Sequence, residues 1–329
     1  MRENPLVSIV AINYNNFKYV LNTLESIANQ TYSNIEFIIV DDFSTDGSLS
    51  LIKQWIADSN IVVKLVCHER NLGVCAACNS GLYNSKGKYV SLIATDDVMM
   101  FDKIEVQVEA LELSENSVCA VYSDMEVIDE NGSVIYESYN ALIGLNSEII
   151  SEFYSKDIPG QIAFLINKNI FPAPAMFFKK EALLSINGWD ENLYFDDLDL
   201  NMRLVHSGYQ YLNSESKLVK YRLLQTSMAR KPNPRYWASY LILISKYRGM
   251  SKEVDLAINS KINELSPLIY QLNGKDSLHW LKENFRIRLN AKSFIYMACS
   301  FMGVRAEWLK KLKNALIMYK ASGHAIIKK

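Results

Sequence analysis

Two adjacent aspartates, Asp96 and Asp97, follow an apolar, β-prone run that covers residues 89–94, with Thr95 between them and the run. A strand of this kind is buried on both faces of a parallel sheet, so its last residues lie at the carboxyl edge, where α/β proteins bind ligands. Two carboxylates repel each other there, and a divalent cation relieves the repulsion, since Mg²⁺ is held by one or two carboxylates together with phosphate oxygens. Aspartate also favours turns and helix caps. The pair therefore predicts either a metal and phosphate site or a solvated turn.

Two further acidic groups occupy comparable places. Asp41 and Asp42 follow the apolar run 35–40, and Asp196 and Asp197 precede residues whose apolar side chains have helical spacing. Negative charge is favourable at the N-terminus of a helix, so a charged helix start is the plain interpretation of the later group. The three groups together predict a site built from carboxylates at element ends.

The elements that must position these carboxylates alternate between strand and helix. Apolar β-prone runs and amphipathic helical patterns follow one another in the first hundred residues. We expect strands at 6–12, 35–40, 61–67 and 89–94, helices at 20–28 and 49–57, and a loop with a helix at 71–83. This alternation predicts an α/β fold with a mixed, mostly parallel sheet flanked by helices.

The rhythm changes after Asp97. We expect a helix at 101–113, a strand at 118–123 and a hairpin within 127–136 that turns at Asn131 and Gly132. Residues 140–185 look less regular, and their prolines predict loops, which hold substrates when they lie near a sheet edge. A short helix then begins near Asp197.

The C-terminal part has a different character. From about residue 235 the pattern is helical, and residues 281–329 carry eleven Lys and Arg against two Glu. We expect a first domain at 1–234, divided into a nucleotide-binding half (1–100) and an acceptor half (101–234), followed by a helical region at 235–329. The basic segment is typical of a solvated helical face; the alternative is an amphipathic helix resting on an anionic membrane surface.

Composition excludes several classes. The formal net charge is −1 and 49% of the residues are hydrophobic, which indicates a folded protein rather than a disordered one or a broad nucleic-acid binder. The longest apolar stretch is far shorter than the roughly 20 residues of a spanning helix. No GxGxxG motif follows the early strands, which disfavours an NAD-linked enzyme.

The cysteines and the N-terminus suggest a compartment. The chain has five cysteines, and no basic and apolar signal segment precedes Val7, so we expect a reduced, cytoplasmic protein. Cys75 and Cys78 have the spacing of a redox motif, but free cysteines are mostly buried structural thiols, which is the interpretation we prefer.

Several motifs in order resemble the family 2 glycosyltransferases of GT-A fold. The resemblance covers about residues 5–230 and rests on these segments: Val7-Ser8-Ile9-Val10 with Tyr14-Asn15, Ile39-Val40-Asp41-Asp42 with Ser44-Thr45-Asp46-Gly47-Ser48, Asn71-Leu72-Gly73 with Asn79-Ser80-Gly81, Asp96-Asp97, Gly188-Trp189-Asp190-Glu191, and Asp196-Asp197-Leu198-Asp199-Leu200.

The resemblance implies roles on the donor side. Tyr14, Asp41 and Asp42 would hold the base and ribose of the donor nucleotide, with uracil as the base, because an aspartate can accept from its imide N–H. Asp96 and Asp97 would hold Mn²⁺ or Mg²⁺ on the diphosphate. We also expect Arg222 to contact the donor phosphates, as basic side chains do.

The acceptor side is implied in the same way. Asp197 matches the general base that takes a proton from the acceptor hydroxyl. Asp196 replaces the glutamate that usually precedes this base and would contribute to acceptor binding. Trp189 would offer an aromatic face to an acceptor sugar, although core packing suits a tryptophan equally well.

The chain departs from the family pattern at three positions. The first residue of the metal motif is Ala94, so the ribose contact of the missing aspartate must come from elsewhere. Leu224 stands where a histidine often follows the arginine by two residues, and Cys78 stands where an arginine usually precedes Asn79. These departures weaken the expected contacts to ribose and phosphate.

The expected function is an inverting, metal-dependent transfer of a sugar from a UDP-sugar to a saccharide or lipid-linked saccharide in bacterial surface polysaccharide synthesis, such as O-antigen or capsule. The expected location is the cytoplasm, with peripheral contact at the inner face of the membrane through the basic helices as an option, and nucleic acid is not an expected partner. Two alternatives remain. A noncatalytic nucleotide- or carbohydrate-binding scaffold would tolerate the departures, and a metal-dependent nucleotidyltransferase would also use paired carboxylates, but a glycine-rich phosphate loop is missing at residues 13–16.

Overall fold

The computed structural model describes residues 4–194, 197–224 and 234–269. The chain divides into two units, Met1–Lys231 and Pro232–Lys329, which are described separately. The predicted boundary at residue 234 stays a prediction.

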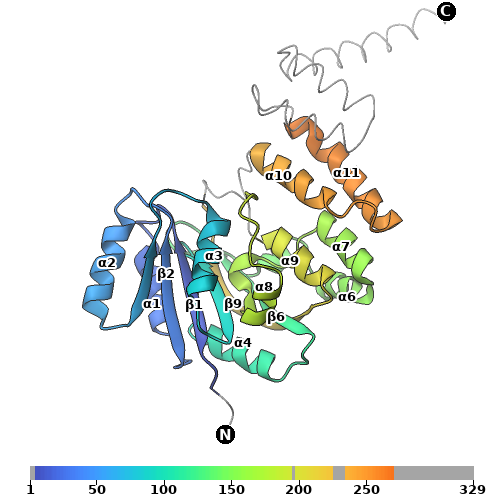
Figure 1. Ribbon diagram of the computed structural model, residues 1–329. Coiled ribbons are helices and arrows are strands. Elements are labelled where there is room, and N and C mark those ends of the chain that lie inside the picture. Colours follow the sequence, from blue (N-terminus) through green and yellow to red (C-terminus); the bar gives the residue numbers. More distant parts are fainter. Residues whose placement is uncertain (1–3, 195–196, 225–233, 270–329) are drawn as a thin grey trace, which may run out of the picture. The chain divides into compact units, whose positions relative to one another are not determined.

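The first half of unit 1 is a four-stranded parallel sheet with helices on both faces (Figure 1). Its strands are β1 (Val7–Asn13), β2 (Ile35–Asp41), β3 (Val63–Cys67) and β4 (Tyr89–Ala94), and its helices are α1 (Val20–Ala28), α2 (Ser48–Ser59) and α3 (Val74–Asn84). The strand order is β3-β2-β1-β4, so the chain leaves β1 on one side and returns on the other. This reversal is a topological switch point, where open α/β sheets bind ligands beyond the strand ends.

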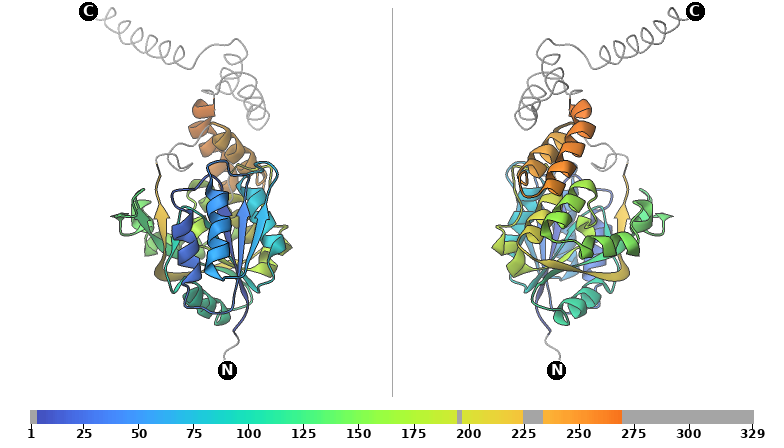
Figure 2. Two further views of the ribbon diagram at one scale, coloured as in Figure 1. Left: turned by 90° about the vertical axis from the view of Figure 1, so that its left-hand side faces the viewer. Right: turned by 90° about the vertical axis from the view of Figure 1, so that its right-hand side faces the viewer.

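Alternate residues of the central strands serve two cores. Ile9, Ala11 and Ile39 pack with α1 and α2 in one hydrophobic cluster, and these two helices lie side by side over that face of the sheet (Figure 2). On the other face α3 packs closely on β1, because a Cβ on Gly81 would lie 2.2 Å from a methyl carbon of Val10. Burial on both faces explains why these strands read as continuous apolar runs.

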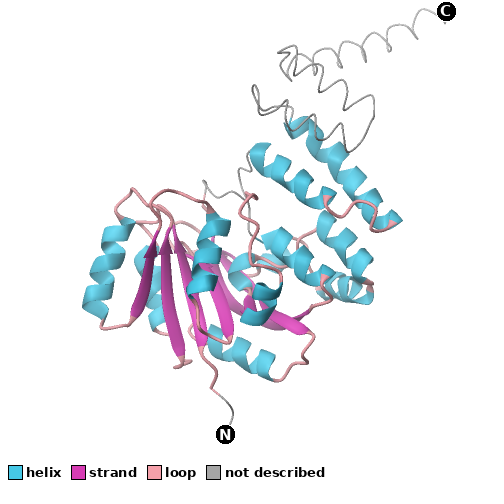
Figure 3. Cartoon of the chain, in the orientation of Figure 1, coloured by secondary structure: helices cyan, strands magenta, loops and turns pink. Residues whose placement is uncertain are grey.

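The second half of unit 1 extends the same sheet with mixed pairing, so that strands and helices form one α/β body (Figure 3). Its elements in order are β5 (Val98–Met99), α4 (Lys103–Glu112), β6 (Val118–Ile128), β7 (Val134–Tyr136), α5 (Tyr139–Leu142), α6 (Ser147–Ser155), α7 (Ile158–Asn167), η1 (Ala173–Ala175), β8 (Phe177–Lys179), α8 (Lys180–Ser185), α9 (Asp197–His206) and β9 (Gln210–Arg222). The order continues β4-β8-β6-β9-β5, with β7 paired to β6. The predicted hairpin is confirmed in this pair, and Gly132 has a positive φ of 89° in its turn.

The expectation that residues 140–185 form loops is wrong for much of the segment, because α6 and α7 occupy it. Each has a side-chain cap: Asn146 accepts from the N–H of Ile149, and Asp157 accepts from that of Gly160. Pro159 lies in the first turn of α7, where a proline is well tolerated because that N–H has no helical partner. The proline therefore starts a helix here.

The described part of unit 2 is the helix pair α10 (Pro234–Ser245) and α11 (Lys252–Ile269), whose buried residues include Leu243, Val254 and Ile258. This confirms the helical pattern for those residues. The basic segment 281–329 lies outside the described residues. No helix in the described ranges combines the length and apolar character that a bilayer crossing needs.

Candidate functional site

The candidate site lies at the carboxyl edge of the parallel strands. Parallel register places Asn13 of β1 beside Asp41 of β2, and Ile12 beside Ala94 of β4. The three strands therefore end at one level, on either side of the switch point, and the segments 41–48 and 94–97 meet around the end of β1.

The buried side chain of Asn13 joins these strand ends. Its amide nitrogen lies 2.7 Å from Asp41 Oδ1 and 3.0 Å from the hydroxyl oxygens of Ser44 and Ser48, and its oxygen accepts from the Thr95 hydroxyl at 2.7 Å. Asp41 is 1% exposed. No sequence motif singled out Asn13, although an amide that ends a strand beside an acidic pair is a signal that could have done so.

Asp42 holds the segment that leads into α3. Its Oδ1 accepts from the N–H of Leu72 at 2.8 Å and lies 2.7 Å from Nδ1 of His68, and its Oδ2 accepts from the N–H of Gly73 at 2.9 Å. Nε2 of His68 in turn lies 2.8 Å from the Ser80 hydroxyl. Asp42 therefore shapes the wall of the site, and its direct contact with a nucleotide stays a prediction.

Exposed aromatic rings flank the same edge. Tyr14, Phe17 and Phe43 are each about half exposed (48%, 51% and 47%). They lie on two loops that are bonded together, since the N–H of Asn15 donates to the Ser44 hydroxyl at 3.0 Å. Tyr14 thus offers a free ring face, as a base-stacking residue must, and stacking itself stays a prediction.

The pair Asp96 and Asp97 has a different environment. Asp97 is 2% exposed, and its Oδ1 accepts from the N–H of Arg222 at 2.7 Å. Burial, and next the charge of Asp96, raise the pKa of Asp97 well above its usual range, and burial also raises the pKa of Asp96. The pair is therefore costly to ionise without a cation.

The donor chemistry of this pair suits a hard divalent cation, because two carboxylates that disfavour their own ionisation gain from a positive charge between them. Within the described ranges, no three His, Cys, Asp or Glu side chains gather into a metal cage. A cation held by Asp96 and Asp97 would therefore need further oxygen ligands from a bound diphosphate and water.

Arg222 holds the turn that carries Asp96 and Asp97 through several contacts. It is 2% exposed; its Nε donates to the carbonyl of Asp96 at 2.8 Å, its Nη1 donates to that of Asp129 at 2.9 Å, and its guanidinium lies 4.5 Å from the ring centre of Tyr19. These contacts fix the turn that carries the carboxylates. The predicted phosphate contact of Arg222 stays a prediction.

Asp197 begins α9, as the helical spacing indicated. Its Oδ1 accepts from the N–H of Leu198 at 2.7 Å and its Oδ2 from the amide of Asn169 at 2.6 Å. It shares the lining of a cavity of about 20 Å³ with Trp189, which is 6% exposed. The proposed sugar contact of Trp189 stays a prediction, and Asp196 lies outside the described residues.

Tyr221 connects the two acidic groups. Its pKa is raised by burial and then by the charges of Asp97, Tyr139, Asp96 and Asp197, and its ring packs edge-to-face on Tyr139 at 5.7 Å between centres. One phenol thus lies within electrostatic reach of the predicted metal ligands and of the predicted base. Nothing in the spacing of the acidic motifs pointed to Tyr221.

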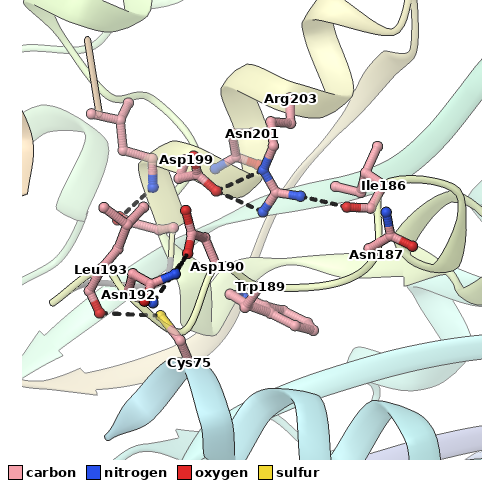
Figure 4. Close-up of polar contacts among 12 residues, drawn as sticks. Cys75, Ile186, Asn187, Trp189, Asp190, Asn192, Leu193, Asp199, Asn201 and Arg203 are labelled. Atoms are coloured by element: carbon pink, nitrogen blue, oxygen red, sulfur yellow. Dashed lines mark hydrogen bonds and ion pairs between the residues drawn. The ribbon is translucent and has the colours of Figure 1, made fainter. Parts of the chain in front are cut away.

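The segment around Trp189 is held from two sides, and Figure 4 shows the contacts of Arg203 on one of them. Arg203 of α9 forms an ion pair with Asp199 at 2.6 Å and donates to the carbonyl of Ile186 at 2.7 Å. Asn79 of α3 bonds the main-chain N–H and carbonyl of Trp189 at 2.8 and 2.9 Å. Asn79 therefore ties the nucleotide-side helix to the predicted acceptor side.

Comparison with sequence families assigns most of unit 1. The family model described as glycosyl transferase family 2 matches residues 8–180. An uncharacterized glycosyltransferase of Methanocaldococcus jannaschii is 27% identical over 224 residues, which cover 67% of this chain and 72% of that protein. One from Rickettsia bellii is 36% identical over 217 residues, covering 62% of this chain but 30% of that longer protein.

Solved structures share the fold. The mannosyltransferase PcManGT from Pyrobaculum calidifontis, in complex with GDP-Man and Mn²⁺, has a TM-score of 0.53 and 15% identity, over 94% of this chain and 88% of that one. S. aureus TarS in complex with UDP has a TM-score of 0.53 and 15% identity, over 93% and 91%. TarS was also solved with UDP-GlcNAc (TM-score 0.53, 16% identity, over 89% and 79%). At this identity the likeness shows the fold alone.

Proposed function

Because this chain belongs to glycosyl transferase family 2 and is a glycosyltransferase of GT-A fold, we propose that it moves a sugar from a UDP-sugar to an acceptor hydroxyl in one inverting displacement. The observation that supports this proposal is that the charges of Asp97, Asp96 and Asp197 all raise the pKa of one buried phenol, Tyr221, whose pKa is raised first by burial. An inverting displacement needs the leaving group and the base on opposite sides of one anomeric carbon, and the proximity of these two acidic groups supports that assignment.

Asp197 is the proposed general base. Its carboxylate takes the proton of the acceptor hydroxyl while that oxygen forms a bond to the anomeric carbon. The bond from the anomeric carbon to the donor phosphate breaks in the same displacement, and UDP leaves with the electron pair. Because the acceptor attacks from the side opposite the leaving group, the configuration inverts.

Asp96 and Asp97 are the proposed ligands of a divalent cation, Mn²⁺ or Mg²⁺. When bound, the cation neutralises charge on the leaving diphosphate. Burial raises the pKa of both carboxylates, and the charge of Asp96 raises that of Asp97 further, which supports this assignment. The Arg222 main chain and guanidinium keep the turn in place.

The donor base is assigned to the loops that follow β1 and β2, with Tyr14 stacking on it and Asp41 and Asp42 lining the site. We assign uracil because a carboxylate can accept from its imide N–H, and the TarS complexes with UDP and UDP-GlcNAc are consistent with it. The PcManGT complex with GDP-Man makes guanine the competing base. A thermal-shift panel of UDP- and GDP-sugars with and without Mn²⁺ separates the two, since a bound donor stabilises the fold.

The acceptor is proposed to be a saccharide or a lipid-linked saccharide of a bacterial surface polysaccharide, such as O-antigen or capsule. The family's usual substrates support this assignment. Residues 1–234 would carry the transfer at the cytoplasmic side of the membrane, with the basic segment 281–329 as a peripheral contact. Liposome flotation of the full chain against a truncation near residue 280 tests that contact, which equal binding would remove.

The replacement Asp197→Asn tests the central assignment. Turnover of the UDP-sugar should fall by about a thousandfold, whereas calorimetric titration should give a UDP affinity close to that of the wild type. The matched control is Asp157→Asn, which changes the aspartate that caps α7 and should leave turnover intact. Loss of UDP binding together with turnover would make Asp197 a structural or donor-binding residue. If the wild-type protein itself binds UDP but does not turn over any UDP-sugar, that result would instead support the noncatalytic scaffold.

A further inference from the structure

Asn169, which no sequence motif singled out, contacts the side chain of Asp197. Its amide nitrogen lies 2.6 Å from Asp197 Oδ2, although the two residues are 28 positions apart in the chain. The side chain belongs to the short segment between α7 and η1, within residues 140–185, for which the sequence predicts loops.

The orientation of this amide is determined by a second bond. The Asn169 oxygen accepts from the N–H of Phe171 at 3.2 Å. The NH₂ group must therefore face the carboxylate, since a flipped amide would place its oxygen against Asp197 and lose both bonds. Asn169 is a donor toward the carboxylate and not a second acceptor.

The segment that carries Asn169 is itself rigidly packed. Ile170 and Phe171 are fully buried, and the Phe171 ring stacks on Tyr211 with 4.1 Å between ring centres. One turn after Asp197, the amide of Asn201 donates to the Phe171 carbonyl at 3.2 Å. Two contacts thus lock the first turn of α9 onto this segment, so the position of Asn169 is transmitted to Asp197.

The charged and titratable surroundings of Asp197 make such a donor useful. Tyr139 of α5 and Tyr221 of β9 both feel its charge, and on its own helix Asp199 is paired with Arg203. Asp96 and Asp97 act on the same Tyr221. A neutral amide hydrogen bond favours the ionised form of a carboxylate without adding charge to this acidic site.

We propose that Asn169 is the positioning residue of the general base: its amide fixes the plane of the Asp197 carboxylate and keeps that group ionised. The inference rests on the proposed function of Asp197. Asn169 itself transfers no proton. Its role is to hold the carboxylate in one orientation toward the acceptor hydroxyl, with Oδ2 bonded to the amide and Oδ1 bonded to the N–H of Leu198.

The direct test measures the titration of Asp197 without any substrate. Protein labelled with ¹³C at the aspartate carboxyl carbon gives an NMR signal that is assigned to Asp197 by its loss in Asp197→Asn. In Asn169→Ala the midpoint should rise by about one pH unit, since a hydrogen bond to a charged group is lost. In the isosteric Asn169→Asp it should rise further, because a second carboxylate now faces the first.

The matched control is Asn167→Ala. Asn167 is an exposed asparagine two residues away whose amide bonds the Ala163 carbonyl of its own helix at 3.0 Å. Its replacement should leave the midpoint unchanged. An unchanged midpoint in both Asn169→Ala and Asn169→Asp, with folded protein in each case, overturns the proposal.

Turnover gives the second readout. With a UDP-sugar that the wild type hydrolyses or transfers, Asn169→Ala should lower kcat by about ten- to a hundredfold at neutral pH and leave KM for the donor near its wild-type value. The acid limb of the plot of kcat against pH should shift to higher pH. A rise in donor KM alone would contradict a positioning role. A wild-type rate that is insensitive to Asp197→Asn would overturn the proposed base, whereas the NMR titration would still decide whether Asn169 stabilises the carboxylate.

Discussion

Two pairs of aspartates follow parallel strands on either side of β1, and the protein treats them in opposite ways. Asp41 and Asp42 accept from Asn13, the N–H of Ser44, the N–H groups of Leu72 and Gly73, and contact His68. In the described part of the chain, Asp97 accepts from the N–H of Arg222, and the Asp96 carboxylate accepts from its own N–H.

The difference teaches where an external partner is needed. A carboxylate surrounded by protein donors is already stabilised and serves to shape a loop. A buried pair with few donors and raised pKa values lacks that stabilisation, so a bound cation would provide the positive charge that stabilises the ionised carboxylates. An identical dipeptide is therefore held by protein donors at one strand end, where it also lines the proposed nucleotide-base site, and has a predicted metal-ligand role at the other.

The largest expected effect is the loss of stability in Asp42→Ala. This change leaves two backbone N–H groups and the His68 ring without their acceptor, so we expect the free energy of unfolding to fall by about 3 kcal/mol. Urea unfolding followed by circular dichroism measures it. Asp58→Ala, at an exposed position near the end of α2, is the control and should change stability little. A similar small change in both variants would remove the structural role of Asp42.

The next effect concerns the cation. In Asp96→Asn the gain in UDP affinity on adding Mn²⁺ should drop by about tenfold or more, because the proposed cation loses a charged ligand. Titration calorimetry with and without Mn²⁺ measures the gain as a ratio. Asp42→Asn should lower UDP affinity or stability without altering that ratio. Persistence of the full Mn²⁺ gain in Asp96→Asn would place the cation elsewhere.

A smaller effect on stability, a gain rather than the loss expected for Asp42→Ala, is expected for Asp97→Asn in the metal-free protein. The pKa of Asp97 is raised in the folded state, because the fold favours the protonated carboxyl group. The contribution of this group to the free energy of unfolding is fully present below the unfolded pKa near 4 and is lost as the pH rises through the folded pKa. At pH 7 the wild type bears this cost and the asparagine does not. We expect a gain of about 1 kcal/mol, since one pKa unit corresponds to about 1.4 kcal/mol.

The pH dependence gives the control for that variant. Thermal unfolding in the presence of EDTA should show a difference between Asp97→Asn and the wild type that shrinks as the pH approaches about 4. Asp42→Asn, by contrast, should not become more stable than the wild type at neutral pH. A destabilised Asp97→Asn protein at pH 7 would mean that the carboxylate is stabilised in its charged form.

The smallest effect tests the loop after the first pair. Phe43 adopts a φ of +66°, in the left-handed region that bulky side chains avoid, and its ring is half exposed. Phe43→Gly should relieve about 1 kcal/mol of strain and lose part of it to the greater freedom of the unfolded chain, for a net gain of about 0.5 kcal/mol. Asn60→Gly, at a φ of +56°, is the control and should gain less, because asparagine tolerates this region.

Much of the parallel half could be predicted from the sequence. Strands buried on both faces are continuous apolar runs, and the amphipathic helices between them are local patterns. The helices α6 and α7 could not be predicted on the same grounds, because Pro159 indicates a loop unless its place in a capped first turn is known.

The site divides in the same way. Asp41, Asp42, Asp96, Asp97 and Asp197 stand at element ends and could be named from local sequence. Asn169 and Tyr221 could not, because their importance arises from contacts across the fold: 28 residues separate Asn169 from Asp197, and Tyr221 is distant in the chain from all three carboxylates that act on it.

One consequence of the Asn13 amide concerns communication across the site. Its two N–H groups and one oxygen join the segment that follows β2 to Thr95, which immediately precedes Asp96. A shift of one segment therefore changes the hydrogen bonds of the other. Nucleotide and cation would be thermodynamically linked through this single side chain, and reciprocity requires that each strengthen the binding of the other by the same factor.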